Sequence, residues 1–245
     1  MAEEQTRPAF YAASPGSPWR DWLTVLHPPY TAWHLAYVVI GAELAPDPKL
    51  VPLLATLLAF FLAVGVAAHT LDELHGRPLG TSIPERWLVG AAGVALAGAA
   101  SVGGLGVDRV GVVLVPFIAL GVFLVIAYNV ELFGGAIHND FVFALAWGSF
   151  PVLTAYVAQT RKLSAAPVLV AAAAFAFSFA QRSLSTRARL IRRSVDHIEG
   201  SIRTADGSRR VIDELFLLEP LERALGALSW GLVALAAGLA IDRMV

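Results

Sequence analysis

The stretch "LVPLLATLLAFFLAVGVAAHTLDELHGRPLG", residues 50–80, opens with 22 residues that include no Asp, Glu, Lys or Arg. It then gathers two histidines, two carboxylates and an arginine within positions 69–77. A transmembrane helix needs about 20 mostly apolar residues, more than apolar core helices of soluble proteins contain. The stretch therefore predicts a membrane-spanning helix with a cluster of ionisable groups at one end.

Long uncharged runs of this kind occur along the whole chain. Of its 245 residues, 57% are hydrophobic and 15% are charged, against about 25% charged residues in soluble domains. The seven runs are Trp22–Ala42, Leu50–Leu71, Trp87–Val107, Val110–Val130, Phe141–Thr160, Leu163–Gln181 and Ala224–Ile241. We therefore predict an all-α, polytopic transmembrane bundle of about seven spans, residues 22–245, after an N-terminal arm, residues 1–21.

Six spans are the alternative count. The sequence "HPPY", residues 27–30, interrupts the first run, so that its helix is expected to start near Tyr30, after the two prolines. The last run could instead form a half-buried helix. The third run is rich in small residues, including Gly90, Gly93 and Gly98. Because small residues let helices approach closely in lipid, this span is predicted to be central and tightly packed.

Composition excludes several other classes of function. The chain has no cysteine, which excludes disulfides, zinc knuckles and thiol catalysis. The net charge of -1 gives no support for nucleic-acid binding. The first ten residues, "MAEEQTRPAF", lack the basic region of a secretory signal peptide. The expected partners are the bilayer and a lipid substrate, and the oligomeric state is left open.

The distribution of basic residues orients the predicted spans. Thirteen Lys and Arg residues fall on the side that holds the N-terminus, and five fall on the other side. The positive-inside rule then predicts a cytoplasmic N-terminus, and seven spans would put the C-terminus outside. All six histidines fall on the same side or in the nearer half of a span. We expect an integral protein of a bacterial or archaeal inner membrane.

The ionisable cluster of residues 69–77 suggests a metal or catalytic site. If the second span continues as a helix through residue 74, His69 and Glu73 share one face and Asp72 lies about 60° away. Ionisable groups within apolar runs are costly and usually functional. The candidate metal ligands are Asp72, Glu73 and His69, together with His34, Glu131 and His138 from other spans.

The metal depends on which of these residues coordinate it. Carboxylates favour Mg²⁺ acting through a substrate phosphate, whereas several histidines on one ion favour Fe or Zn. Asp72 and Glu73 would be ligands, and His69 a ligand or a base. The alternative is that these side chains are interfacial polar groups at helix ends.

A basic amphipathic segment, residues 183–223, is predicted to lie along the cytoplasmic surface. Arg182, Arg189 and Arg193 fall within about 40° of one another on a helical projection. One interpretation is attraction to anionic lipid headgroups. The other is that the arginines face the polar cluster and bind a diphosphate, since the planar guanidinium group makes paired contacts with phosphate oxygens.

The end of the second span followed by "GRPLGTSIP", residues 76–84, resembles the first aspartate-rich motif of the UbiA-type intramembrane prenyltransferases. The stretch "AYNVELFGGAIHNDFVFALAWGSFPVL", residues 127–153, is similar to the junction of that family's fourth and fifth spans. The resemblance implies a helical bundle that holds an isoprenyl diphosphate through Mg²⁺ and transfers the prenyl group. It also implies that Arg77 contacts phosphate and that Tyr128 and Asn139 belong to the substrate site.

The sequence departs from the family pattern in two places. His69 stands where the family has Asn. The second aspartate-rich motif should follow the sixth span, where the chain offers only Asp196 and Glu199, as a displaced remnant. The leading hypothesis is therefore a divergent UbiA-like enzyme, with His69, Asp72 and Glu73 as catalytic residues.

Two other functions stay open. A non-haem Fe or Zn oxidoreductase would use His34, His69, Glu131 and His138, although the histidine motifs of membrane desaturases are absent. A non-catalytic, lipid-binding relative would account for the missing second motif.

Overall fold

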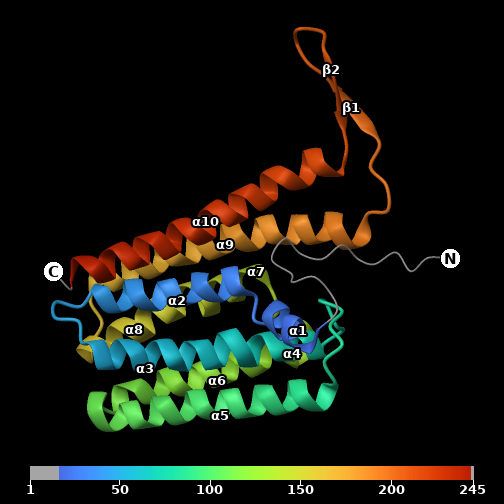
Figure 1. Ribbon diagram of the computed structural model, residues 1–245. Helices are drawn as coiled ribbons and strands as arrows, with labels where there is room; N and C mark the ends of the chain where they lie inside the picture. Colours follow the sequence, from blue (N-terminus) through green and yellow to red (C-terminus); the bar gives the residue numbers. More distant parts are fainter. Residues whose placement is uncertain (1–16, 244–245) are drawn as a thin grey trace.

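The protein is a bundle of long helices from which a β-hairpin projects, as a computed structural model describes it for residues 17–243 (Figure 1). Residues 1–16 of the predicted N-terminal arm lie outside this range. The α-helices are α1 Pro18–Val25, α2 Pro28–Glu43, α3 Leu50–Phe60, α4 His69–Leu74, α5 Glu85–Val110, α6 Val115–Asn129, α7 Asp140–Ala144, α8 Phe150–Thr160, α9 Ala165–Ser194 and α10 Glu214–Asp242. Two π-helical segments, η1 Phe61–Ala68 and η4 Leu145–Ser149, and two 3₁₀ turns, η2 Val112–Leu114 and η3 Leu132–Gly135, join some of them.

Among the described residues, six helices are long and apolar enough to cross a membrane. Three of them are composite, since η2 and α6 together form Val112–Asn129. Helices α3 and α4 are joined through η1 into one rod, Leu50–Leu74, and α7 and α8 through η4 into another, Asp140–Thr160. The chain is therefore an all-α membrane protein, and the count of six matches the alternative prediction. The first predicted run instead forms the short α1 and the 16-residue α2.

Helix α2 is short because its start is fixed by proline. His27 adopts a left-handed conformation with φ of 46° directly before Pro28 and Pro29, the first residues of the helix. At 1.5 Å per residue, α2 spans about 24 Å, less than the roughly 30 Å of a hydrocarbon core. The predicted start near Tyr30 is confirmed to within two residues.

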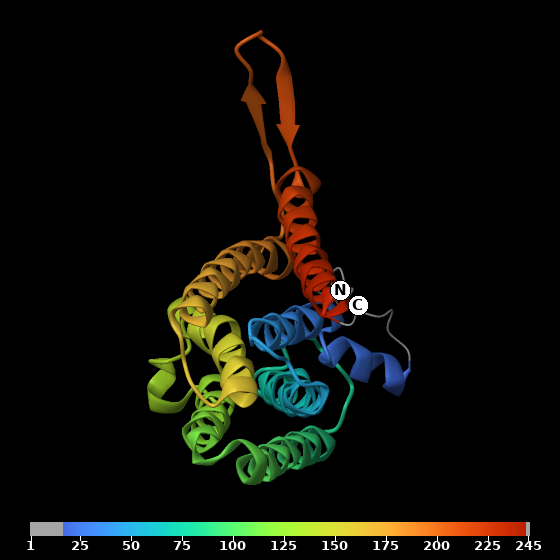
Figure 2. The same cartoon turned by 90° about the vertical axis from the view of Figure 1, so that its left-hand side faces the viewer.

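Despite its length, α2 lies at the centre of the bundle. It packs against α10, α8 and α3, and Figure 2 shows it enclosed by its neighbours. Trp33, Tyr37 and Val38 on α2 are almost fully buried. A Cβ at Gly41 would lie 2.3 Å from the Val152 carbonyl oxygen, so α2 and α8 touch backbone to backbone there.

Helix α5, predicted to be central, lies at the edge of the bundle (Figure 2), and that prediction is wrong. Its buried residues Leu88, Ala92, Ala95 and Ala99 recur every three or four positions, on one face only. A Cβ added at Gly90 or Gly93 would meet no neighbouring atom within 4 Å. Small residues permit close packing but do not impose it: on α5 a Cβ at Gly103 would lie 2.8 Å from the flexible Ile118 side chain, whereas Gly41 on α2 and Gly148 in η4 meet backbone atoms of a neighbouring helix.

The predicted surface helix within residues 183–223 is not a separate element. Helix α9 continues without a break from the apolar sixth run through the arginines, over 30 residues. An antiparallel hairpin, β1 Gly200–Arg203 and β2 Arg209–Ile212, follows and leads into α10. The stretch "TADGSRR", predicted as a turn, supplies the hairpin turn, where Gly207 has a φ of 86°. Both helices extend past the bundle and carry the hairpin away from it (Figure 1).

Candidate functional site

A polar pocket of about 280 Å³ lies at the start of α2, beside the part of α9 that contains the arginines and the part of α10 that contains Glu222. Eight of the residues predicted from the sequence line it, and they come from several helices and the loop before α7. These residues are His34, His69, Asp72, Tyr128, His138, Arg182, Arg189 and Arg193. The predicted convergence of the histidines, Asp72 and the arginine stripe in one cavity therefore occurs.

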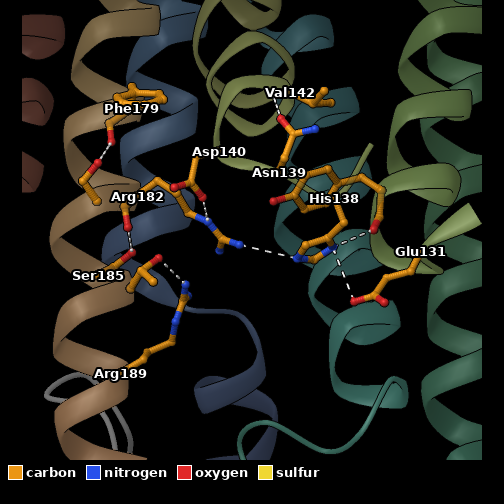
Figure 3. Close-up of polar contacts among 12 residues, drawn as sticks. Glu131, His138, Asn139, Asp140, Val142, Phe179, Arg182, Ser185 and Arg189 are labelled. Atoms are coloured by element: carbon orange, nitrogen blue, oxygen red, sulfur yellow. Dashed lines mark hydrogen bonds and ion pairs between the residues drawn. The ribbon is translucent and has the colours of Figure 1, made fainter. Parts of the chain in front are cut away.

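The arginines reach the pocket because they follow the repeat of α9. Arg182, Arg189, Arg192 and Arg193 all line it, and spacings of three, four and seven keep residues on one helical face. Figure 3 shows the Arg182 side chain between Asp140 and His138. Its Nε donates to Asp140 Oδ1 at 3.1 Å, and its Nη2 lies 3.4 Å from His138 Nε2.

The other arginines are held differently. Arg189 Nη2 donates to Thr186 Oγ1, one turn earlier, at 3.2 Å, and Arg192 Nε donates to Glu222 Oε1 of α10 at 2.6 Å. Pocket-lining carboxylates from the described residues are Asp72 and Glu222, against four arginines. Since Glu222 pairs with Arg192, the pocket has a surplus of positive charge and suits an anion.

Backbone carbonyls fix two of the histidine rings. His34 Nδ1 lies 2.9 Å from the Trp147 carbonyl oxygen, and His138 Nδ1 lies 3.0 Å from that of Tyr128. A carbonyl oxygen only accepts hydrogen bonds, so each Nδ1 bears the proton and each neutral ring keeps a lone pair on Nε2. In His138 this lone pair faces the Arg182 guanidinium.

A second pair of histidines closes the side of the pocket near α1. The His69 ring stacks on His27 with a centroid distance of 4.5 Å, and His69 Nδ1 lies 3.1 Å from the Gly65 carbonyl oxygen. Burial lowers the pKa of His27 well below its usual range, and neighbouring His69, Arg189 and Arg193 lower this pKa further. His27 is therefore neutral at pH 7.

The π-helical segments supply carbonyls to this arrangement. Gly65 lies in η1 and Trp147 in η4, and their carbonyl oxygens accept from His69 and His34. A π-helical turn widens the helix and is often found at functional sites. Both turns fall within apolar runs, where no residue pattern distinguishes them from an ordinary α-helix.

Glu73 does not line the pocket. It is fully buried, and its carboxylate accepts from the backbone N–H groups of Leu79 and Thr81, both at 2.9 Å, and from the Thr81 hydroxyl at 2.7 Å. Glu73 therefore organises the loop between α4 and α5. Arg77 lies in the same loop and donates to the carbonyl oxygens of Thr81 at 3.2 Å and Ile83 at 2.6 Å.

Glu131 and Asn139 shape the next loop rather than the pocket. A Glu131 carboxylate oxygen lies 3.6 Å from His75 Nε2, and the other lies 3.7 Å from His138 Nδ1. Asn139 caps α7 by accepting from the Val142 N–H at 3.0 Å (Figure 3). Neither residue is among those that line the pocket.

The displaced remnant of a second acidic motif also lies elsewhere. Asp196 and Glu199 are exposed, in the segment between α9 and the hairpin, and neither lines the pocket. Glu199 Oε2 lies 3.8 Å from His197 Nε2.

The donor set does not fit a metal held by protein carboxylates. Within residues 17–243, no three His, Asp or Glu side chains are placed to share an ion. Asp72 lines the pocket, but Glu73 and Glu131 do not, and His138 Nε2 faces Arg182. Magnesium, iron and zinc therefore remain predictions of the sequence alone.

Seven polar pocket residues were not among the predicted site residues. They are His27, Tyr30, Asn129, Gln181, Ser185, Arg192 and Glu222. The spacing along α9 could have revealed Arg192, three residues after Arg189. Glu222 offered no such signal, because it returns to the pocket only through the hairpin, whose strands are too short to predict.

An apolar cavity of about 130 Å³ adjoins the polar pocket, between α3, α5, α6 and α8. The Trp147 ring lines both. Aromatic rings gather at this junction: Tyr128 lies 5.3 Å from Trp147 and 6.1 Å from Phe143, between ring centroids. The polar pocket and the apolar cavity therefore adjoin at a group of aromatic side chains.

Comparisons of the chain with protein-family models, with curated proteins and with solved structures found no match.

Proposed function

We propose that this membrane protein binds an isoprenyl diphosphate, or a similar phosphate-headed lipid, and transfers or modifies its hydrocarbon chain in the manner of the UbiA-type prenyltransferases. The observation that carries the proposal is the junction at Trp147. There a pocket with four arginines meets a cavity lined by apolar side chains. A lipid with an anionic head and a hydrocarbon tail has the complementary chemistry.

The arginines would hold the diphosphate. Arg189 and Arg193 carry the surplus charge of the pocket, because Arg182 pairs with Asp140 and Arg192 with Glu222. Charge-assisted hydrogen bonds from guanidinium to phosphate are about twice as strong as neutral ones. This role replaces the one that Mg²⁺ and two aspartate motifs have in the family that the sequence resembles.

The same geometry supports a transfer reaction. When the allylic carbon–oxygen bond breaks, the electron pair goes to the diphosphate, where the arginines stabilise the developing charge. The allylic cation that remains would face the rings of Tyr128, Phe143 and Trp147, which attract cations through their π faces. A nucleophilic acceptor then forms the new bond to this carbon and releases a proton.

The arginine-rich end is placed in the cytoplasm by this proposal, as the distribution of basic residues favours. The diphosphate released by the reaction would then leave into the cytoplasm, and a water-soluble acceptor would enter the pocket from the same side of the membrane.

The test is binding and turnover of farnesyl diphosphate by the full chain in detergent micelles. We expect the double variant Arg189→Ala/Arg193→Ala to weaken binding by more than tenfold, whereas Arg187→Ala, an exposed residue of the same helix, keeps wild-type affinity. Equal affinity in all three proteins would contradict the proposal. Binding without release of diphosphate, over a panel of acceptors, would favour the non-catalytic lipid-binding relative.

A further inference from the structure

The inner part of the polar pocket contains two buried hydrogen-bonding atoms without a partner, and one of them, an amide oxygen, is an acceptor that an anion cannot satisfy. Gln181 Oε1 is buried and has no hydrogen-bond partner, and the same is true of the Tyr128 hydroxyl. Both residues line the pocket and are more than nine-tenths buried. A buried polar atom without a partner costs about 1–3 kcal/mol, so such atoms in a pocket indicate the chemistry of a ligand.

His34 adds a second acceptor at this level. Its ring is 4% exposed, and its Nδ1–H is committed to the Trp147 carbonyl oxygen at 2.9 Å. Nε2 is then the nitrogen left for the pocket, and it carries a lone pair in the neutral ring. A lone pair repels a phosphate oxygen and attracts an O–H or N–H donor.

The acceptors and the two arginines proposed to carry the surplus charge, Arg189 and Arg193, lie at different depths along α9, while Arg182 beside Gln181 pairs with Asp140. Gln181 stands eight residues before Arg189, about 12 Å along the helix axis. His34 is on α2, whose Tyr37 hydroxyl donates to the Ala174 carbonyl oxygen of α9 at 3.2 Å. The α2 face with His34 therefore lies along the inner part of α9, while Arg189 and Arg193 lie nearer the mouth.

We infer that, of the phosphate-headed lipids that the proposed function allows, the one bound in this pocket bears hydroxyl groups beside its phosphate and is not a bare isoprenyl diphosphate. Its head group is a phosphorylated polyol whose hydroxyls donate to His34 Nε2 and Gln181 Oε1. This inference rests on the proposed function, because the α9 arginines anchor the phosphate. Hydroxyls fit better than an ammonium group, since four arginines line the same pocket and would repel a second cation.

A matched pair of probes tests the inference: glycerol 3-phosphate and n-propyl phosphate, which share the phosphate and the three carbons and differ by two hydroxyls. Calorimetry on the full chain in detergent should show glycerol 3-phosphate binding at least about tenfold more tightly, a difference of 1.4 kcal/mol. In His34→Phe and in Gln181→Leu the ratio should fall toward one, with the affinity for n-propyl phosphate unchanged.

The outcomes separate this inference from the proposed function. Arg189→Ala should weaken both probes by the same factor and keep their ratio. If the wild-type protein binds the two probes equally, the hydroxyl inference is overturned while phosphate binding stands. If it binds neither probe at millimolar concentration but binds farnesyl diphosphate, the inference is overturned and the proposed function stands; if it binds none of the three, both fail. The ratio of the two affinities is measured first on the wild-type protein. The inference can therefore be tested even if a variant fails to fold.

Discussion

The two sides of the polar pocket use clustered charge in different ways. On α4, Asp72 and Glu73 are adjacent in sequence, yet only Asp72 lines the pocket, while Glu73 is buried under its own loop. On α9, four of the five arginines, spread over twelve positions, line the pocket, and the fifth, Arg187, is exposed. Because adjacent helical residues point about 100° apart, spacing along the helix decides which groups share a site, and density along the sequence does not.

The largest effect should follow from Glu73→Gln. A glutamine offers one acceptor oxygen where the carboxylate accepts from Leu79 N–H, Thr81 N–H and the Thr81 hydroxyl, and its NH₂ group would face one of these donors. Breaking a buried charged network costs about 3–5 kcal/mol. We expect Tm to fall by about 6 °C or more, measured by thermal unfolding in detergent. An unchanged Tm would contradict the structural role that distinguishes Glu73 from Asp72.

Arg189→Ala tests the α9 side. The variant should weaken the binding of inorganic diphosphate by about 10- to 100-fold, since charge-assisted hydrogen bonds contribute about 1.5–3 kcal/mol each. Its Tm should stay close to that of the wild type. A loss of stability comparable to that of the Glu73 variant would mean that this arginine, too, is structural.

Acidification should affect the histidine side of the pocket. In the unfolded chain His27 takes up a proton near pH 6.5, whereas burial holds its pKa in the folded protein well below this value. Its contribution to stability is therefore complete above about pH 6.5 and is lost as the pH falls below that value. His69, Arg189 and Arg193 face the same ring and oppose its protonation.

The measurement is Tm between pH 7 and pH 5 for the wild type and for His27→Asn, which tolerates the left-handed backbone. The decline in the free energy of unfolding should be shallower in the variant by at most about 1.4 kcal/mol per pH unit. Parallel curves would assign the acid sensitivity to other groups.

The smallest effect is expected for Asp72→Asn. Without Mg²⁺, removing a negative charge from the pocket should strengthen diphosphate binding a few-fold, because the repulsion is partly screened by solvent. If Asp72 instead holds Mg²⁺, as the sequence predicts, the variant will bind more weakly than the wild type when Mg²⁺ is added. A calorimetric titration with and without added Mg²⁺ separates the two roles.

The sequence predicted the features that depend on composition and helical repeat. Uncharged runs located the apolar helices, and the projection of Arg182, Arg189 and Arg193 placed them on one face. It also located the approximate break before α2. These signals are local, because each depends on residues within a few turns of one helix.

Features that depend on contacts between helices could not be predicted. Gly148 illustrates this: a Cβ there would lie 2.6 Å from the Ala174 carbonyl oxygen, yet nothing near Gly148 distinguishes it from the exposed glycines of α5. The same holds for Glu73, whose partners lie in a loop with three left-handed residues, Gly76, Arg77 and Gly80. The hairpin that brings Glu222 to Arg192 could not be predicted either, because its strands are only four residues long.

The short α2 bears on how the proposed ligand would enter. At about 24 Å this central helix is shorter than the roughly 30 Å of a hydrocarbon layer, and residues at its start line the pocket. Under the proposed function, the floor of the pocket would therefore lie below the plane of the surrounding lipid headgroups, and a phosphate-headed lipid would reach the arginines by moving sideways within its leaflet, without lifting its chain into water. The energetic barrier to loading would then be set by lateral diffusion and by the desolvation of one head group.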